Sequence, residues 1–404
     1  MTHDRTTRGF GQRTRLEAAR ETLLSAVDPL ERTTSVPLAE VDARVLAEPV
    51  TATRAVPNEL RAAMDGFAVR ASDTVGASDR SPTRLRPADT VGPGAAERVH
   101  TGSALPDAAD AVVMIEHVER TDEDIFVREA VAEGENVRPA GEDVAADQQL
   151  FDRGHRLQPA DLGLLRAVGR DTVTVYDRPT VEVVPTGEEL VRDDPGRGET
   201  VETNGLTISR YVRRWGGEPR YRDVVTDDAA AIRAAIERGC DADAVVTTGG
   251  SSVGERDIVP DVVAEIGSVL VHGVAVKPGY PVAMGMVDST PVLLLPGYPV
   301  SCLVNAVQFL RPLVARLGHT SPGPHPTTRA TLARKIPSEP GVRTFVRVRL
   351  DASGDPPEAV PVRAGGASVL SSVTLADGWV VVPEAREGID AGTQVAVEHW
   401  GWSP

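Results

Sequence analysis

The stretch DAVVTTGGSSVGERDIVPD, residues 243–261, sets the fold of the chain around it. It begins with a short apolar strand at Ala244–Thr247, passes through a turn that contains Gly249 and Gly250, and predicts a helix that ends near Ile266. This order is how an open α/β sheet forms an anion site, because glycines let the backbone approach a ligand and the N–H groups of the helix start face it. The turn is neither GxGxxG nor GxxxxGK[ST], so a Rossmann dinucleotide site or a Walker ATPase is a poor match.

The hydroxyls of Thr248, Ser251 and Ser252 add hydrogen-bond donors to this turn. A plain strand-to-helix connection is the preferred explanation of a single Gly-Gly pair, so the turn counts as a site only together with other loops. Strands and helices alternate from residue 179 to residue 317, which predicts one doubly wound α/β domain with a largely parallel sheet. Outside this domain, helical spacing predicts helices at 16–26, 38–46 and 159–168.

Polar turns follow several strands of this predicted domain. Glu188 and Glu189 come after one strand, Pro296–Ser301 comes after another, and Lys277 stands in a Pro-Gly loop. We expect all of them at the carboxyl edge of one sheet, where open α/β sheets bind ligands. Backbone donors and one cation suit a phosphate, and carboxylates suit a metal ion or water activation. A chance grouping is the alternative.

Three earlier loops also carry polar residues. Asp65 stands beside a glycine, and an Asp-Gly turn, a helix cap, a metal site or a reacting group would each explain it. Thr101 lies in a Thr-Gly turn that is either structural or able to hold an oxyanion, and Asp143 lies in a loop with paired carboxylates. Short strands around 72–98, and alternation after a linker at 320–326, predict two β-rich regions.

Composition limits the classes of partner. The 404 residues include 43 Lys and Arg against 59 Asp and Glu, a net charge of −16, and the only lysines are Lys277 and Lys335. An acidic, lysine-poor surface suggests a salt-adapted cytosol, although a GC-rich genome also favours arginine over lysine. The acidic balance argues against nucleic acid as the main partner, because phosphate backbones need basic patches.

The same sequence predicts a cytoplasmic protein without a membrane partner. We find no run of about 18 apolar residues that would span a bilayer, and the polar N-terminus has no signal-peptide core. Cys240 and Cys302 do not form a CxxC pair, so we expect small buried thiols in a reducing compartment.

Seven motifs in order resemble the MoeA family, the molybdopterin molybdenumtransferases, which are related to the E domain of animal gephyrin. The resemblance covers nearly the whole chain from about Leu16. The motifs are AAMDGFAVR (62–70), HTGSALPDAADAVVMIE (100–116), VRPAGEDV (137–144), PTGEEL (185–190), TTGGSSVGERD (247–257), KPGYP (277–281) and LPGYPVS (295–301). Each motif is weak alone, and their order makes the resemblance specific.

The resemblance implies a multidomain α/β plus β fold. An elongated N-terminal domain would take residues 13–48 and 141–176, and an inserted β-rich domain residues 49–140. A doubly wound α/β molybdopterin-binding domain would take residues 177–320, and a small C-terminal β domain residues 327–404. Such proteins form elongated homodimers, with the active site between the α/β domain of one subunit and the inserted domain of the other.

The implied reaction takes adenylylated molybdopterin and molybdate, releases AMP and uses a divalent cation such as Mg²⁺; an upstream molybdopterin adenylyltransferase is a possible partner. By motif position we expect Asp65, Glu189, Asp257 and Lys277 to be catalytic, with the three carboxylates also binding metal. The expected substrate-binding residues are Thr101, Asp143, Thr248, Gly249, Gly250, Ser251, Ser252, Pro296, Gly297, Pro299 and Ser301. Taken alone, Asp65 is a turn carboxylate and Glu189 a charge at a helix start.

The sequence departs from the family pattern at three site positions. At one of them Thr248 replaces the serine of SGG, which keeps a hydroxyl. Tyr280 replaces the second lysine of KPGKP, and Tyr298 replaces the asparagine of PGNPVS. These changes remove a positive charge and an amide, although a tyrosine supplies a phenol donor and a stacking face. They leave open whether tungstate replaces molybdate and whether the chain is a non-catalytic molybdopterin-binding scaffold. An unrelated nucleotide hydrolase with the same α/β domain is a third alternative, which the motifs at 62–70 and 100–116 disfavour.

Overall fold

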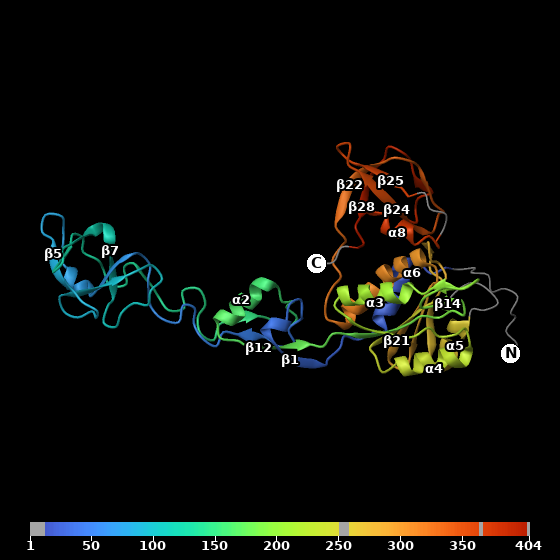
Figure 1. Ribbon diagram of the computed structural model, residues 1–404, viewed down its shortest axis with the longest axis horizontal. Helices are drawn as coiled ribbons and strands as arrows, with labels where there is room; N and C mark the ends of the chain where they lie inside the picture. Colours follow the sequence, from blue (N-terminus) through green and yellow to red (C-terminus); the bar gives the residue numbers. More distant parts are fainter. Residues whose placement is uncertain (1–12, 250–257, 363–366, 402–404) are drawn as a thin grey trace. The chain divides into compact units, whose positions relative to one another are not determined.

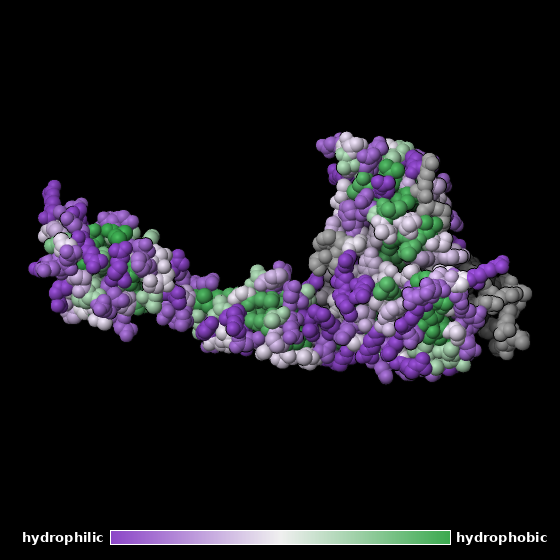
Figure 2. All heavy atoms as spheres, viewed as in Figure 1, coloured by the Kyte–Doolittle hydropathy of each residue, from purple (hydrophilic) through white to green (hydrophobic). Residues whose placement is uncertain are grey.

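The computed structural model describes residues 13–249, 258–362 and 367–401. The chain divides into two compact units, one of Met1–Arg32 with Tyr176–Pro404 and one of Thr33–Val175 (Figure 1). Hydrophilic residues cover much of the visible face of each unit, and smaller patches of apolar residues lie among them (Figure 2).

A six-stranded sheet is the centre of the first unit, in the order β16-β13-β17-β21-β20-β18. The first three strand pairings are parallel and the last two antiparallel, so that β20 alone runs against the other strands; this confirms the prediction of a largely parallel sheet. The strands are β13 (Thr180–Val184), β16 (Glu218–Tyr221), β17 (Ala244–Thr248), β18 (Ser268–His272), β20 (Ala283–Val287) and β21 (Thr290–Leu295).

Helices cover both faces of this sheet because its strands are apolar on both sides. Val246 of β17 packs into one core and its neighbour Val245 into the other, as the alternation of side chains along a strand requires. The chain passes from β13 to β16 and then back across β13 to β17, so the strand order reverses between β13 and β17. One face carries α1 (Leu16–Ser25), α3 (Asn204–Arg214) and the helix that follows β21, and the other carries α4 (Ala229–Gly239) and α5 (Ile258–Ile266).

The helix after β21 is the longest core helix of the unit. It begins at Pro299, because proline suits the first helical position. It consists of α6 (Pro299–Asn305), the π-helical turn η5 (Ala306–Leu310) and α7 (Arg311–Leu317). By length and composition this 19-residue run could cross a membrane, contrary to the sequence expectation, but 89% of its apolar window is buried inside the protein. Its hydropathy therefore reflects packing in the core.

Two N-terminal expectations need correction. Residues 13–48 are expected in the elongated domain, but Leu16, Ala19 and Leu23 of α1 join the core of the α/β sheet, because their spacing places them on one helical face. The helix predicted at 38–46 is absent from the structure: only Leu38–Glu40 forms a 3-10 turn, and Ala43 adopts a left-handed φ of 61° that an α-helix cannot continue through.

The C-terminal part of the first unit is a small β-barrel. Its sheet has the order β19-β24-β25-β22-β28-β26, and an additional pairing of β24 with β26 closes five of the strands. Trp379 at its base is 1% exposed and stacks on Trp400, at 4.7 Å between ring centroids. The strands are β19 (Val276–Lys277), β22 (Thr327–Leu332), β24 (Arg343–Asp351), β25 (Glu358–Pro361), β26 (Gly378–Val382) and β28 (Gln394–Glu398).

The second unit is mostly β-structure. One sheet has the order β7-β4-β6-β5-β9-β8 and encloses a core around Phe67 and Ile125. A second core, around Leu157 and Leu165, lies under α2 (Pro159–Ala167), which begins with the capping box of Gln158 and ends before Gly169 at φ +87°. The strands of the first sheet are β4 (Gly66–Val69), β5 (Thr83–Pro87), β6 (Ala95–Val99), β7 (Ala111–Met114), β8 (Val118–Arg120) and β9 (Ile125–Val127).

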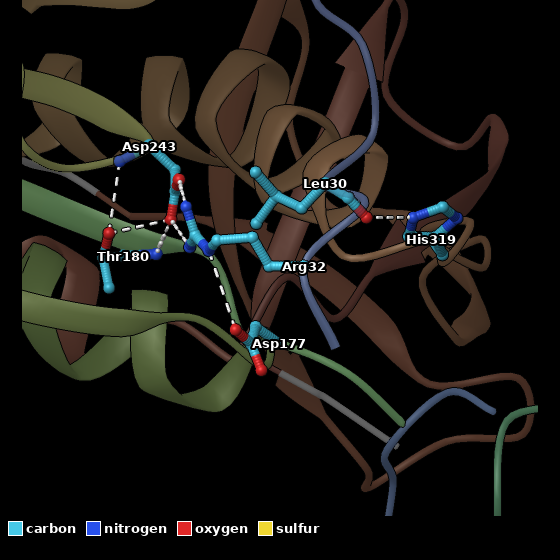
Figure 3. A network of polar contacts seen from close by, with 6 residues as sticks. All are labelled: Leu30, Arg32, Asp177, Thr180, Asp243 and His319. Carbon is cyan, nitrogen blue, oxygen red and sulfur yellow. Dashed lines mark hydrogen bonds and ion pairs between the residues drawn. The ribbon is translucent and has the colours of Figure 1, made fainter. Parts of the chain in front are cut away.

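A polar network anchors the chain where it leaves and re-enters the first unit (Figure 3). Asp243 accepts hydrogen bonds from both terminal nitrogens of Arg32, at 2.7 and 2.9 Å, and from the backbone and hydroxyl of Thr180, at 2.7 and 2.8 Å. Arg32 also faces Asp177 at 3.6 Å, and the His319 ring contacts the Leu30 carbonyl at 2.6 Å. Burial alone would raise the pKa of Asp243, but the bonds from Arg32 and Thr180 outweigh it and lower the pKa.

We expect Asp243→Asn to lower the free energy of unfolding by about 1–3 kcal/mol at neutral pH, the cost of breaking a charged hydrogen-bond set. Because the folded pKa is depressed, the carboxylate's contribution is present above the unfolded pKa and is lost as the pH falls below about 4. Urea unfolding between pH 3 and 7 measures this, and the variant should show a smaller decline at the acid end. Asp223→Asn is the control, since Asp223 forms an exposed pair with Arg192; equal losses in the two variants would contradict the prediction.

Candidate functional site

Three turns meet at the carboxyl edge of the α/β sheet. They follow β13, β17 and β21, three parallel strands whose ends share one edge. A Cβ built on Gly249 would lie 2.1 Å from the Thr186 carbonyl oxygen, and one built on Gly297 would lie 3.6 Å from the Gly249 Cα atom. The Gly249 N–H donates to the Leu295 carbonyl at 3.0 Å. The turns therefore converge, as predicted, at the point where the strand order reverses.

Polar side chains at this edge have unused hydrogen-bonding capacity. The hydroxyls of Thr186 and Thr248 are buried, and neither has a hydrogen-bond partner among the described residues. A buried hydroxyl without a partner costs free energy, so a ligand that supplies acceptor oxygens would be favoured there. Glu189 is exposed on the turn after Thr186, and its carbonyl accepts the Thr200 N–H at 2.7 Å.

Two helix starts face the same edge. The Asn204 side chain, at the first position of α3, donates to the Gly297 carbonyl at 2.6 Å. Pro296 is buried and Pro299 begins α6, while Ser301 in its first turn is 3% exposed. N–H groups at a helix start have no intrahelical partner and carry partial positive charge, so this edge suits an anion.

Lys277 is not at the end of a strand of this sheet, contrary to the sequence expectation. It lies on β19, which pairs in parallel with β24 of the C-terminal barrel. The loop that follows this exposed lysine is held against α6, because the buried Asn305 side chain donates to the Gly279 carbonyl at 2.8 Å and to the Ser301 carbonyl at 2.9 Å. The barrel also reaches α6, since the Val300 N–H donates to the Ala367 carbonyl at 3.1 Å.

We expect Asn305→Ala to release the loop of Lys277 while leaving the sheet intact. The change leaves the buried Gly279 carbonyl without its side-chain donor, at a cost of about 1–3 kcal/mol. Hydrogen exchange of the peptide 274–281 should therefore quicken by about tenfold or more. Gln394→Ala is the control, since it removes a hydrogen bond that a side-chain amide donates within the barrel, to the hydroxyl of Thr331. Unchanged exchange in 274–281 would show that Asn305 does not hold the loop.

A second cluster lies in the second unit. Asp65 Oδ1 accepts the Thr101 N–H at 2.7 Å and the Thr101 hydroxyl at 2.9 Å. The backbone bond first, and then the hydroxyl, lower the pKa of Asp65, so its carboxylate stays charged. Thr101 and Asp143 line one cavity of about 600 Å³. The structure thus brings together three predicted residues from three motifs.

The same cavity contains basic residues that sequence reasoning missed, namely Arg54, Arg61 and Arg138. Arg138 lies in the VRPAGEDV motif, in which we considered only the carboxylates as site residues. The guanidinium of Arg61 donates to the Gly102 carbonyl at 3.1 Å, which fixes it beside Thr101. The cavity can therefore neutralise an anionic ligand as well as offer a carboxylate.

Some predicted residues are not located by the structure. Gly250, Ser251, Ser252 and Asp257 lie outside the described residues. Glu189 belongs to the first unit and Asp65 to the second. Within residues 13–249, 258–362 and 367–401 no three or more histidine, cysteine, aspartate or glutamate side chains form a metal-binding group.

The sheet and its converging turns define an α/β domain that can bind an anionic ligand where the strand order reverses, in a chain with two β-rich regions. Residues 14–169 match the MoeA N-terminal region (domain I and II), and residues 329–400 match the MoeA C-terminal region (domain IV). Residues 182–316 match a family described as a probable molybdopterin binding domain.

Relatives and solved structures agree with these matches. A Mycobacterium tuberculosis protein named molybdopterin molybdenumtransferase 2 is 33% identical over 91% of this chain and 95% of its own. A Methanocaldococcus jannaschii protein, placed by its name in molybdopterin biosynthesis, is 34% identical over 93% of this chain and 94% of its own. The crystal structure of a molybdopterin biosynthesis MoeA protein from Pyrococcus horikosii has a TM-score of 0.83 and 35% identity, covering 97% of this chain and 100% of that one. The chain belongs to the MoeA family.

Proposed function

We propose that this protein is a molybdopterin molybdenumtransferase of molybdenum cofactor biosynthesis, which takes molybdenum from molybdate to adenylylated molybdopterin and releases AMP. The observation that carries the proposal is the convergence of Thr186, Gly249 and Gly297 beside two helix starts. Both substrates are anions, and this edge combines buried hydroxyls, close backbone approach and helix N-termini.

The chain's own residues would act as follows at this edge. The hydroxyls of Thr186 and Thr248 would donate to oxygens of the bound oxyanion or phosphate, which satisfies groups that have no other described partner. Lys277 would add a point charge to the phosphate, held in place by the Gly279–Asn305 contact. Glu189 and Asp257 would present carboxylates for positioning and for activation of water.

We place the cluster of Asp65, Thr101 and Asp143 on the opposite side of the active site, supplied by the second subunit of a homodimer. The donor set fits Mg²⁺, because exposed carboxylates such as Asp65 and Glu189 are the hard oxygen ligands that this cation prefers. When bound there, Mg²⁺ would offset the charge of two anionic substrates. The arginines around Thr101 would hold a phosphate from the other side.

We extend the proposal to the cellular setting of the protein. It works in the cytoplasm and receives adenylylated molybdopterin from an upstream adenylyltransferase. The proposal also keeps the expected division into domains. These are an inserted β-rich domain of residues 49–140, an α/β domain of residues 177–320, a C-terminal β domain of residues 327–404 and a separate elongated domain.

The test measures AMP release by the purified chain with Mg²⁺ and adenylylated molybdopterin in high salt, in the presence of molybdate, of tungstate and of neither. We expect release that depends on molybdate and that Glu189→Ala loses. Release with tungstate alone would assign the same chemistry to the other oxyanion. Tight pterin binding without AMP release under either oxyanion would overturn the transferase proposal and favour a binding scaffold. Tyr280 and Tyr298 would then be the substitutions that distinguish it from a catalytic member of the family.

A further inference from the structure

A second cavity lies in the first unit, away from the sheet edge. It has a volume of about 610 Å³ and is bounded by α1, by the helix segment η5–α7, by the linker 320–326 and by the C-terminal barrel. We call it the arginine pocket, after Arg20, Arg311, Arg316 and Arg343, which line it. These arginines come from three separate parts of the chain. From Pro299 to Arg311 the helix formed by α6, η5 and α7 rises by about 18 Å. The pocket and the turns after β13, β17 and β21 therefore lie at different heights along this helix.

The pocket is strongly basic in an acidic protein. Its lining contains four guanidinium groups and one carboxylate, Glu398, which accepts the Trp379 indole N–H at 2.8 Å. Arg343 is paired with Glu17 and Glu384. Arg20, Arg311 and Arg316 form no ion pair with any carboxylate of the described residues. In a chain of net charge −16, this local excess of positive charge would attract an anion.

Neutral acceptors hold these guanidinium groups in place without cancelling their charge. Arg20 donates to the Gln308 backbone carbonyl at 3.0 Å and to its side-chain oxygen at 2.7 Å, both presented by the π-helical turn η5. Arg311 donates to the Gly323 carbonyl at 2.7 Å, and Arg316 to the Val27 carbonyl at 3.1 Å. Since a guanidinium has five N–H donors, each arginine keeps donors for a ligand.

Desolvation makes an anionic ligand more favourable here. Burial lowers the pKa of Arg311, and burial is also the main cause that lowers the pKa of Arg20. His325 lines the pocket with its Nε2 atom 3.2 Å from Arg311, and its buried Nδ1 atom has no partner among the described residues. Because a guanidinium only donates, Nε2 accepts and Nδ1 keeps the proton of the neutral ring. The pocket thus has an unpaired buried donor beside three arginines without ion pairs.

The geometry points to a binding site for an organic phosphate of nucleotide size in the arginine pocket. Arginine binds phosphate bidentately, and the volume lies within the range of ligand cavities. Leu24, Phe345 and Val381 line the pocket as well, which gives an apolar surface for the organic part. An inorganic anion would leave that surface uncovered. This site is separate from the proposed catalytic edge and does not depend on the transferase reaction.

The test is titration calorimetry of the full-length chain with ADP, with pyrophosphate and with adenosine, at low and at high KCl. We expect ADP to bind more tightly than either other probe and to weaken with salt. Arg311→Ala should weaken ADP binding tenfold or more. Arg329→Ala is the matched control, because Arg329 is exposed on β22 outside the pocket, and it should leave this affinity unchanged. Lys277→Ala separates this site from binding at the catalytic edge, because ADP binding in the arginine pocket must persist in that variant.

Several results would overturn the assignment. They are an absence of ADP binding, equal binding by wild type and Arg311→Ala, and loss of binding in Lys277→Ala alone. Pyrophosphate binding as tight as ADP binding would leave an anion site without a role for the organic part and would also contradict the proposal. If circular dichroism shows that Arg311→Ala fails to fold, Arg316→Ala takes its place with the same expected loss.

Discussion

Replacing Gly249 by alanine is expected to abolish AMP release almost completely. Gly249 has a φ of +151°, and an added Cβ would lie 2.1 Å from the Thr186 carbonyl oxygen, far inside contact distance. The turn after β17 must therefore separate from the turn after β13, and Glu189 moves with the latter. Displacement of reacting groups by about 1 Å costs about a hundredfold in rate, so we expect at least that loss in oxyanion-dependent AMP release.

The matched control for Gly249→Ala is Gly216→Ala. Gly216 also has a positive φ, +93°, but an added Cβ there would meet no atom of the described residues within 4 Å. Gly216→Ala should therefore lower the free energy of unfolding by about 1–3 kcal/mol through backbone strain alone. It should leave the specific activity of the folded protein unchanged. Full activity in Gly249→Ala would show that the closeness of the two turns is not needed for the reaction.

The α/β domain could be predicted because its signals are local. Apolar strands such as 244–248 and the helices between them follow their own periodicity, and parallel strands place their ends at one edge without further information. The turns after β13, β17 and β21 were therefore found together. The helix predicted at 38–46 failed because spacing does not reveal a left-handed residue such as Ala43.

Contacts between distant segments could not be predicted in this way. Lys277 belongs to a strand that pairs with Arg343 and Thr344, and no local pattern indicates that partner. Asp65 and Thr101 were each predicted from a motif, but their hydrogen bonds join residues 36 positions apart. The arginines of both cavities were missed because this chain uses arginine throughout, and only their position around a shared cavity distinguishes them from the others.

Asp65→Asn is expected to lower oxyanion-dependent AMP release by about a hundredfold or more, the usual range for a lost acid–base group, with little effect on stability. Asparagine has nearly the same shape, and its side-chain oxygen can still accept the two bonds from Thr101. The variant therefore removes charge and preserves geometry. Steady-state rates with saturating molybdate, together with a melting temperature, separate these effects. Wild-type activity in this variant would assign the carboxylate to the turn alone.

The pH profile tests the same carboxylate from the other direction. The Thr101 donors lower the pKa of Asp65, so the charged form persists to lower pH than in an ordinary aspartate. Thr101→Val removes the hydroxyl and keeps the backbone donor, so the pKa should rise and the acid limb of the activity profile should move to higher pH. Asp65→Asn should lack that acid limb altogether. An unshifted limb in Thr101→Val would mean that another group controls the fall in activity, and the charge of Asp65 would then lose its place in the proposed reaction.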